Sequence, residues 1–547
     1  MSTLSVEALP DDVETLRALV IERQSQLEEQ RARLEDHEAR IEAYREQIAQ
    51  LEEWVRLLRG QRFGRSSEKV SPDQLGLFNE AEQTAEAVAR EPEDEPAVVS
   101  VPAHERRAGG RRPLPDWMER VEVRHDLPEA EKVCGADGTA LVEIGREIRE
   151  QLEVIPQQVF VRRHVRPKYA CPKCHDGVKI APLPPQPIPR SVASPSLLAS
   201  IAVAKYADGL PLYRQEAMLV RGGVDLSRAT LAHWMVALGP LVQPLVNLIR
   251  EQILDSGYVQ ADETTFPVLK ESGKAASSPG YLWVLLGGAR ASPGPGVVFE
   301  YAPSRSGAVA RALLEDFEGT LQTDGFAGYD ELGARAGVRH LGCFAHARRG
   351  FVEALRGQGK SPGRSGSHGP KVSVAAQGLA QIRSLYAIER TIGDASPEER
   401  LRVRQEQARP LLEKLRAWLD VSRDRVPPQS LTGKALGYLD RQWPKLVRYV
   451  EDGRAEIDTN QVENAIRPFV IGRKNWLFAD TVRGAQASAN LYSLIETAKR
   501  AGLEPFAYLR HVFAELPGAT TLAEIEQLLP HRVDRDALRP AVNDAPR

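Results

Sequence analysis

Residues 258–268 read "YVQADETTFPV", an apolar run that two adjacent carboxylates, Asp262 and Glu263, interrupt before it resumes. The β-branched and aromatic content of this stretch predicts a β-strand. Either the strand simply ends at the acids, which then face water, or the strand carries a carboxylate because chemistry requires one there. The choice depends on partner acids further along the chain.

The segments that follow "YVQADETTFPV" have the order strand, strand, helix, strand: "GYLWVLLGG", "GVVFEYA", "SGAVARALLEDF" and "GTLQTDGFAGY". Three meandering strands, a crossover helix and a fourth strand form the opening of a ribonuclease-H-like domain, in which the first and fourth strands are neighbours. Asp262 on the first strand and Asp324 at the end of the fourth, 62 residues apart (324 − 262), are therefore predicted to lie close together.

A third acid is predicted in "IDTNQVENAIRPFVIGRK", which begins at residue 457. Asn460 is expected to cap a helix in which Glu463 and Arg467 share a face at i, i+4. The alternative is that Glu463 only forms a capping-box-like pair with Asn460. Arg467, Arg473 and Lys474 follow closely, and such a cationic cluster suits contact with DNA phosphates.

Three carboxylates at one site would hold two Mg²⁺ or Mn²⁺ ions about 3.5–4 Å apart, as two-metal phosphoryl-transfer sites do. Asp262 is expected to bridge both ions, with Asp324 on one and Glu463 on the other. Mg²⁺ takes few carboxylates and completes its shell with water and substrate phosphate. Glu263 points to the opposite face by strand alternation and is not expected to be a ligand.

The N-terminal region, residues 1–60, has a heptad pattern of apolar residues in a highly charged segment. The pattern predicts a coiled coil and therefore a homo-oligomer. A lone amphipathic helix packed on its own domain is the alternative. The first heptad series consists of Val13, Val20, Leu27, Leu34, Ile41, Ile48 and Val55.

Residues 61–115 have the composition of a flexible linker, with an acidic, Pro-rich part and the basic segment "ERRAGGRRPLP". The basic segment either follows a DNA groove or is an ordinary basic linker. "RFGRSSEK" (62–69) is either a solvated turn or a phosphate-contacting hinge.

Residues 116–190 alternate apolar and polar side chains, which predicts a small zinc-finger-like β domain. Cys171 and Cys174 form a CxxC knuckle, and Cys134 is the only other thiol nearby. Tetrahedral zinc needs a fourth ligand, which is either His125 or Asp137. A redox CxxC is the alternative, although no βαβ pattern surrounds it.

Residues 191–245 contain three short helical segments that are separated by Gly-containing turns. Ser227 is a suitable N-cap for the third segment, which presents Arg228, Thr230 and His233 in its first two turns. This arrangement suits a helix-turn-helix with its third helix in a DNA major groove. A small helical bundle without a DNA role has the same pattern.

The chain resembles the insertion-sequence-66 family of DDE transposases, in their large TnpC-type subunit. The motifs that carry the resemblance include "RFGRSSEK", "HDLPEAEKVC", "RPKYACPKC", "KYADGLPLYRQEAMLVRGG", "ADET", "TDGFAGY", "CFAHARRGF", "DTNQVENAIRPFVIGRKNWLF" and "EPFAYLRHV". The resemblance implies that Asp262, Asp324 and Glu463 are the catalytic triad. It also implies a zinc-finger-like segment with two CxxC pairs, of which the first is here reduced to Cys134 and Asp137.

The predicted architecture is therefore multidomain α+β: coiled coil, zinc-finger-like β domain, helix-turn-helix, and an RNase-H-like α/β core with an α-helical insertion. The resemblance implies a core in two parts, 246–356 and 457–515, around an insertion at 357–456, followed by a tail at 516–547. The interval from Asp324 to Glu463 is 139 residues (463 − 324).

Cys343 in "CFAHARRGF" is predicted to pack in the core, while His346, Arg348 and Arg349 either touch DNA or are ordinary surface residues. Trp476 and Phe478 are predicted to pack in an aromatic core, with stacking on an unpaired base as the alternative.

The implied function is a transposase that binds the terminal inverted repeats of its element, cuts a strand and joins it to target DNA. Small accessory proteins of the same element are further implied partners. The net charge of −3 neither requires nor excludes DNA. No apolar run has the length of a membrane span and no signal-peptide core is present, so a cytoplasmic, nucleoid-associated protein is expected. The alternatives are a domesticated, non-catalytic DNA-binding regulator and a structure-specific RNase-H-like nuclease.

Overall fold

The computed structural model describes residues 12–63, 122, 159–169, 179–275, 278–288, 296–358 and 373–538. The chain divides into two compact units. One consists of Phe78–Arg162, and the other combines Met1–Leu77 with Arg163–Arg547. Every helix and strand given below belongs to the larger unit. The predicted zinc ligands His125, Cys134, Asp137, Cys171 and Cys174 lie outside the described residues, as do the basic linker and most of "RFGRSSEK". Of the predicted zinc-finger-like β domain, a two-stranded antiparallel pair is described, β1 (Lys168–Tyr169) and β2 (Lys179–Ile180).

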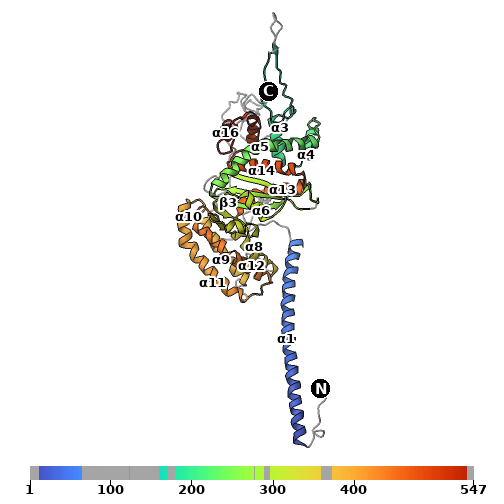
Figure 1. The fold of residues 1–547 in the computed structure, drawn as a ribbon, viewed down its shortest axis with the longest axis vertical. Coiled ribbons are helices and arrows are strands. Elements are labelled where there is room, and N and C mark those ends of the chain that lie inside the picture. Colours follow the sequence, from blue (N-terminus) through green and yellow to red (C-terminus); the bar gives the residue numbers. More distant parts are fainter. Residues whose placement is uncertain are drawn as a thin grey trace, which may run out of the picture. The chain divides into compact units, whose positions relative to one another are not determined.

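The N-terminal segment is one continuous helix, α1 (Val13–Phe63), coloured blue in Figure 1. The apolar heptad positions are exposed along it: Val20 is 57% exposed, Leu34 60% and Ile48 57%. The predicted helix is therefore confirmed, and its apolar seam faces solvent rather than a core in the single chain. The pairing of α1 with a second copy stays a prediction.

The three helices predicted before the core are present as α3 (Pro195–Tyr206), α4 (Leu212–Arg221) and α5 (Arg228–Asp255). Ser227 caps α5 as expected, because its side chain accepts a hydrogen bond from the Thr230 N–H. Helix α5 does not end with the predicted domain at residue 245. It continues for ten more residues, and its buried face includes Leu231, Trp234 and Ile253.

Helix α5 shares one hydrophobic core with the strands that follow, because Leu198, Trp234 and Val284 belong to the same buried cluster. Within the described residues, α5 is the one helix that is long and apolar enough to cross a membrane. Its apolar side chains instead pack in this core, which accounts for its composition.

The central sheet has five strands in the order β6-β5-β3-β7-β8. Strands β5 (Tyr281–Gly287) and β6 (Gly296–Ala302) continue antiparallel from β3 (Tyr258–Thr265), while β7 (Gly319–Gln322) and β8 (Val338–Leu341) are parallel to β3. The expected contact between the first and fourth strands is present, because β3 pairs with β7. A second, two-stranded parallel sheet joins β4 (Val268–Lys270) to β9 (Ala479–Thr481).

Helix α14 (Val482–Arg500) covers the sheet and packs closely on both β6 and α5 (Figure 1). Its hydroxyl groups bond the backbone of the edge strand β6. Ser493 Oγ accepts from the Phe299 N–H at 2.8 Å, and Thr497 Oγ1 accepts from the Val297 N–H at 3.0 Å. These bonds give acceptors to two backbone N–H groups that, on an edge strand, would otherwise have no strand partner.

A second buried cluster lies in the helices of the predicted insertion, drawn in orange in Figure 1. Arg400 and Arg404 are buried there and form ion pairs with Glu389 and Glu456. The helical content predicted for this region is confirmed. The helices of the insertion are α9 (Val374–Thr391), α10 (Pro397–Val403), a π-helical turn (Arg404–Ala408), α11 (Arg409–Arg423) and α12 (Leu431–Leu446), followed by a 3₁₀ turn (Val447–Glu451). Helix α8 (Phe344–Gly357), which was predicted as the last part of the first core segment, also packs in this second cluster.

The remaining elements return to the first core. They are α6 (Gly307–Leu313), a 3₁₀ turn (Ala327–Tyr329), α7 (Asp330–Gly333), α13 (Asn460–Trp476), α15 (Pro505–Glu515), a 3₁₀ turn (Leu516–Gly518) and α16 (Leu522–Glu526). Of these, α13 carries the third predicted acid, and it packs against β3 and β5.

Candidate active site

The register of the sheet puts Asp262 and Asp324 on one face. The last paired residues of β3 and β7 are Gln260 and Gln322. Asp262 and Asp324 each lie two residues further on, and side chains two apart on a strand point to the same side. Asp262 is the fifth residue of β3 and is partly buried, whereas the four residues before it ("YVQA") are fully buried. Asp324 lies just beyond β7, where its Oδ1 accepts the Phe326 N–H at 2.8 Å.

Buried polar side chains fix the start of α13 against the ends of these strands. Tyr258 donates its O–H to Gln322 Oε1 at 2.6 Å, and Gln260 Oε1 accepts the Val462 N–H at 3.2 Å. Gln322 Nε2 donates to the Glu456 carbonyl oxygen at 2.8 Å. Sequence analysis missed this network, although glutamines in otherwise apolar strand segments are a recognisable signal, because buried polar groups need partners.

Glu463 lies in the first turn of α13, but it does not cap the helix. The N-cap is Thr459 rather than the predicted Asn460, and the Asn460 N–H is bonded by Asp458 Oδ1 at 3.1 Å. The capping-box interpretation of Glu463 is therefore wrong. Glu463 Oε1 is buried and, within the described part of the chain, has no hydrogen-bond partner.

Two residues of α8 face Glu463. His346 Nδ1 lies 3.7 Å from Glu463 Oε1, and Arg349 Nη2 lies 3.7 Å from Glu463 Oε2. Burial and the Arg349 charge lower the pKa of His346, while Glu463 and Asp324 oppose that change. The i, i+3 spacing in "CFAHARRGF" was the signal for this shared face.

The charges of the acids act on one another. The pKa of Asp262 is raised to about 8, chiefly by burial and in smaller part by the neighbouring Glu263, Asp324 and Glu463. A carboxyl group in this position is costly to ionise unless a cation compensates it. Three carboxylates are hard oxygen donors of the kind that Mg²⁺ and Mn²⁺ prefer, so the residues present fit such an ion.

Glu263 is turned to other partners. Its Oε1 accepts from Arg305 at 2.6 Å and its Oε2 accepts from the Tyr329 O–H at 2.7 Å. Its side chain is fully covered. These contacts support the prediction that Glu263 is not a metal ligand.

Cys343 is buried, as predicted, and its Sγ accepts from the Thr459 backbone N–H at 3.4 Å and hydroxyl at 3.2 Å. Trp476 also packs as predicted, with its ring in a cluster with Phe266 and Phe469, whereas Phe478 is 44% exposed.

The predicted DNA contacts of α5 lie far from the acids along the chain path. Arg228 and His233 are exposed and Thr230 is partly buried at the start of α5, a helix of 28 residues whose other end leads into β3. At 1.5 Å per residue this helix is about 40 Å long. The structure therefore does not bring these three residues to the carboxylates.

The three basic residues of α13 differ in their contacts and in their exposure. Arg473 bonds the Thr265 carbonyl and, at 2.8 Å, its hydroxyl, so it ties α13 to the end of β3. Arg467 is partly buried and Lys474 is exposed. Arg473 therefore has a structural role that its sequence context did not predict.

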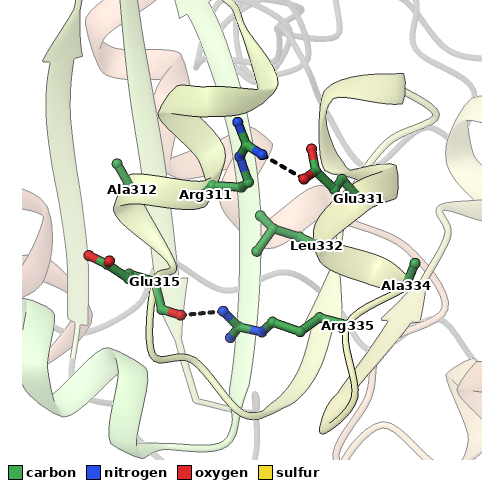
Figure 2. A pocket seen from close by; sticks show the side chains of 7 residues that line it. All are labelled: Arg311, Ala312, Glu315, Glu331, Leu332, Ala334 and Arg335. Carbon is green, nitrogen blue, oxygen red and sulfur yellow. Dashed lines mark hydrogen bonds and ion pairs between the residues drawn. The ribbon is translucent and has the colours of Figure 1, made fainter.

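One cavity of the described residues lies away from the three acids. It has a volume of about 610 Å³ and is lined by Arg311, Ala312, Glu315, Glu331, Leu332, Ala334 and Arg335, none of the three acids among them (Figure 2). Across it Arg311 pairs with Glu331 at 2.5 Å, and Arg335 donates to the Glu315 backbone carbonyl. A smaller cavity of about 80 Å³ between α8 and α9 is lined by Arg348, Arg383, Tyr386 and Arg390.

Comparison with known proteins gives four matches to family patterns. Residues 190–487 match the "Transposase IS66 family", and residues 131–175 match the "zinc-finger binding domain of transposase IS66". Residues 50–123 match "Transposase C of IS166 homeodomain", and residues 493–531 match the "IS66 C-terminal element". Cys134, Asp137, Cys171 and Cys174 fall within the zinc-finger match, whereas His125 does not.

Similar full-length relatives occur in Sinorhizobium fredii (strain NBRC 101917 / NGR234). The uncharacterized protein y4jD is 31% identical over 538 residues, covering 96% of this chain and 98% of the relative. The uncharacterized protein y4qI is 31% identical over 558 residues, covering 98% and 99%.

Proposed function

The chain belongs to the IS66 family of transposases, and from this we propose that it cuts and joins DNA at the ends of an insertion sequence with Asp262, Asp324 and Glu463 as its divalent-metal ligands. The observation that carries the proposal is the placement of the three acids: Asp262 lies on β3, Asp324 directly follows the neighbouring strand β7, and Glu463 lies in the first turn of α13, which packs against β3. The strand order β6-β5-β3-β7-β8 supports an RNase-H-like core around these acids.

In this proposal Asp262, Asp324 and Glu463 would hold two Mg²⁺ or Mn²⁺ ions. When bound, such ions supply an activated attacking oxygen and neutralise charge at the scissile phosphate. Arg349 would contribute a cation beside Glu463 for a phosphate oxygen of the DNA. The Gln260–Gln322 network would keep the start of α13, and so Glu463, in position against β3 and β7.

The reaction would have two steps at phosphorus. Water attacks the phosphate at the element end, the bond to the 3′ oxygen breaks, and a 3′-hydroxyl is released with its proton. That hydroxyl then attacks a target phosphodiester, loses its proton to solvent, and displaces the target 3′ oxygen.

The other domains would deliver the DNA. The α3–α5 helices, with Arg228, Thr230 and His233, and the zinc-finger segment would bind the terminal inverted repeats, and α1 would pair two protomers so that two ends meet. Arg467 and Lys474 remain proposed phosphate contacts. The chromosome is the substrate, so the protein would act on cytoplasmic nucleoid DNA.

The test is cleavage of an intact element end and strand transfer of a pre-cut one by the purified full-length protein with Mg²⁺ or Mn²⁺. Wild type is compared with Asp262→Ala, Asp324→Ala and Glu463→Ala, and with Asp316→Asn, an exposed acid, as the matched control. Joined product from wild type and the control alone is the expected result. Cleavage without joining would instead identify a nuclease, and DNA binding without either reaction, with accessory proteins supplied, would identify a regulator.

A further inference from the structure

Two buried polar atoms face each other beside the proposed active site without a bond between them. Glu463 Oε1 and His346 Nδ1 are 3.7 Å apart, which is too far for a hydrogen bond. Both atoms are buried, and neither has a hydrogen-bond partner within the described residues. Buried polar atoms are seldom left unpaired, so a pair that faces one gap indicates a missing third group.

The gap is held open by the backbone around it. Helices α8 and α13 begin side by side, because the Phe344 N–H donates to the Ile457 carbonyl at 3.1 Å and Thr459 donates twice to Cys343 Sγ. His346 and Glu463 lie three and four residues into these helices. Their separation therefore follows from fixed helix starts rather than from two free side chains.

The donor set around the gap suits a cation. Ligand atoms of Cys343, His346 and Glu463 lie within 4.8 Å of one another, but Cys343 Sγ already accepts two bonds from Thr459. Asp324, which follows β7, is the other carboxylate whose charge reaches His346. What remains is one imidazole nitrogen with carboxylate oxygens.

We propose that His346 is a fourth protein ligand of the divalent ion that Glu463 holds, and that this nitrogen favours Mn²⁺ over Mg²⁺. The inference rests on the proposed function, since it extends the ligand set of the same site. Imidazole suits transition metals, whereas Mg²⁺ prefers oxygen donors, so the added nitrogen shifts the preference.

The test is Mn²⁺ binding to the full-length protein, with one equivalent of Zn²⁺ present to occupy the cysteine segment. Pulsed electron paramagnetic resonance detects coupling from a histidine nitrogen to bound Mn²⁺. Wild type is expected to show it. His346→Gln should lose it and bind Mn²⁺ about tenfold more weakly, in the range found when groups that support a metal are removed.

Two further variants make the outcome decisive. His511→Gln, a histidine on α15, is the control and should match wild type. His346→Asp supplies a negatively charged oxygen donor in place of the neutral amide of His346→Gln, so it should bind Mg²⁺ more tightly than His346→Gln does. Circular dichroism melting of each variant shows whether it folds.

Failure of the inference and failure of the proposed function give different results. Mn²⁺ binding that is lost in Glu463→Gln but unchanged in His346→Gln, or nitrogen coupling that persists in His346→Gln, would overturn the role of His346 alone. Mn²⁺ binding that Glu463→Gln and Asp262→Asn leave unchanged would overturn the metal site itself.

Discussion

A negative charge on Asp262 is unfavourable in the folded protein unless a cation lies beside it. The pKa of Asp262 is raised from an ordinary value of 3.8 to about 8, so the folded state binds this proton more tightly than the unfolded state does. Stability that depends on this group is therefore greatest at low pH and is lost as the pH rises from about 4 to about 8.

Asp262→Asn is expected to stabilise the metal-free protein above pH 8, by about 1–3 kcal/mol, because it removes a carboxylate that is costly to ionise. Near pH 4 the variant and wild type should be nearly equal. Thermal unfolding measured from pH 4 to pH 9 with a chelator checks this, with Asp316→Asn as control. Parallel curves for the variant and wild type would contradict the prediction.

Gln322→Leu is expected to destabilise the protein by about 2–4 kcal/mol, because it leaves Tyr258 O–H and the Glu456 and Gly342 carbonyls without their partner. Urea unfolding measures this loss. Because the same network positions Glu463, Mn²⁺ affinity should also fall. An unchanged unfolding midpoint would show that the network is not needed for stability.

The sequence could predict that Asp262 and Asp324 belong to neighbouring strands, because the order of strands and helices determines which strands pair, and β3 does pair with β7. The catalytic role of these acids and of Glu463 stays a prediction. It could not predict His346 opposite Glu463, since that contact depends on how two helix starts are joined through Cys343 and Thr459. The cap of α13 was wrongly assigned to Asn460 because Asp458, two residues earlier, supplies the side-chain oxygen.

At the scale of elements, the contact of α14 with β6 depends on two hydroxyl groups. Ser493→Ala and Thr497→Val leave the Phe299 and Val297 N–H groups without acceptors, so each is expected to cost about 1–3 kcal/mol. Amide hydrogen exchange should accelerate along β6 before it does along β3. Unchanged protection of β6 in both variants would show that the hydroxyls are dispensable.

Helix α9 carries two of the arginines that line the cavity of about 80 Å³. Under the proposed function this cavity is suited to a DNA phosphate. The double variant Arg383→Gln/Arg390→Gln should weaken DNA binding and reduce the slope of log affinity against log salt by about two.

Arg402→Gln on α10 is the matched control for the α9 variant, since Arg402 pairs with Glu399 and Glu406 on an exposed face. Its salt slope should equal that of wild type. An unchanged slope in the α9 double variant would exclude phosphate contact in this cavity.

The elements themselves were well predicted, but their ends were not. The apolar pattern of α5 has no break at residue 245, because its second half packs in the same core as its first half. Helix α14 was predicted only as part of the core. Thirteen of its 19 residues are buried, including Asn490, Ser493 and Thr497, so polarity along the sequence did not reveal its burial.

At the scale of the whole molecule, the exposed seam of α1 predicts self-association. Leu34→Glu with Ile41→Glu should convert an oligomer to a monomer, because charges at heptad positions oppose the packing of a second helix. Light scattering after gel filtration measures the mass, with Gln24→Glu as control. A monomeric wild type, or an unaffected oligomer in the variant, would contradict the prediction.

The position of the insertion also has a consequence for the timing of synthesis. Glu463 is 139 residues beyond Asp324, so the ribosome has placed both aspartates long before the third acid exists. At about 5–20 residues per second, that interval lasts roughly 7–28 s. The helices of the insertion emerge during this time, and α13 can dock only after they do. Under the proposed function, a truncated or stalled chain therefore lacks a complete set of acids and would not cut DNA before its synthesis is finished.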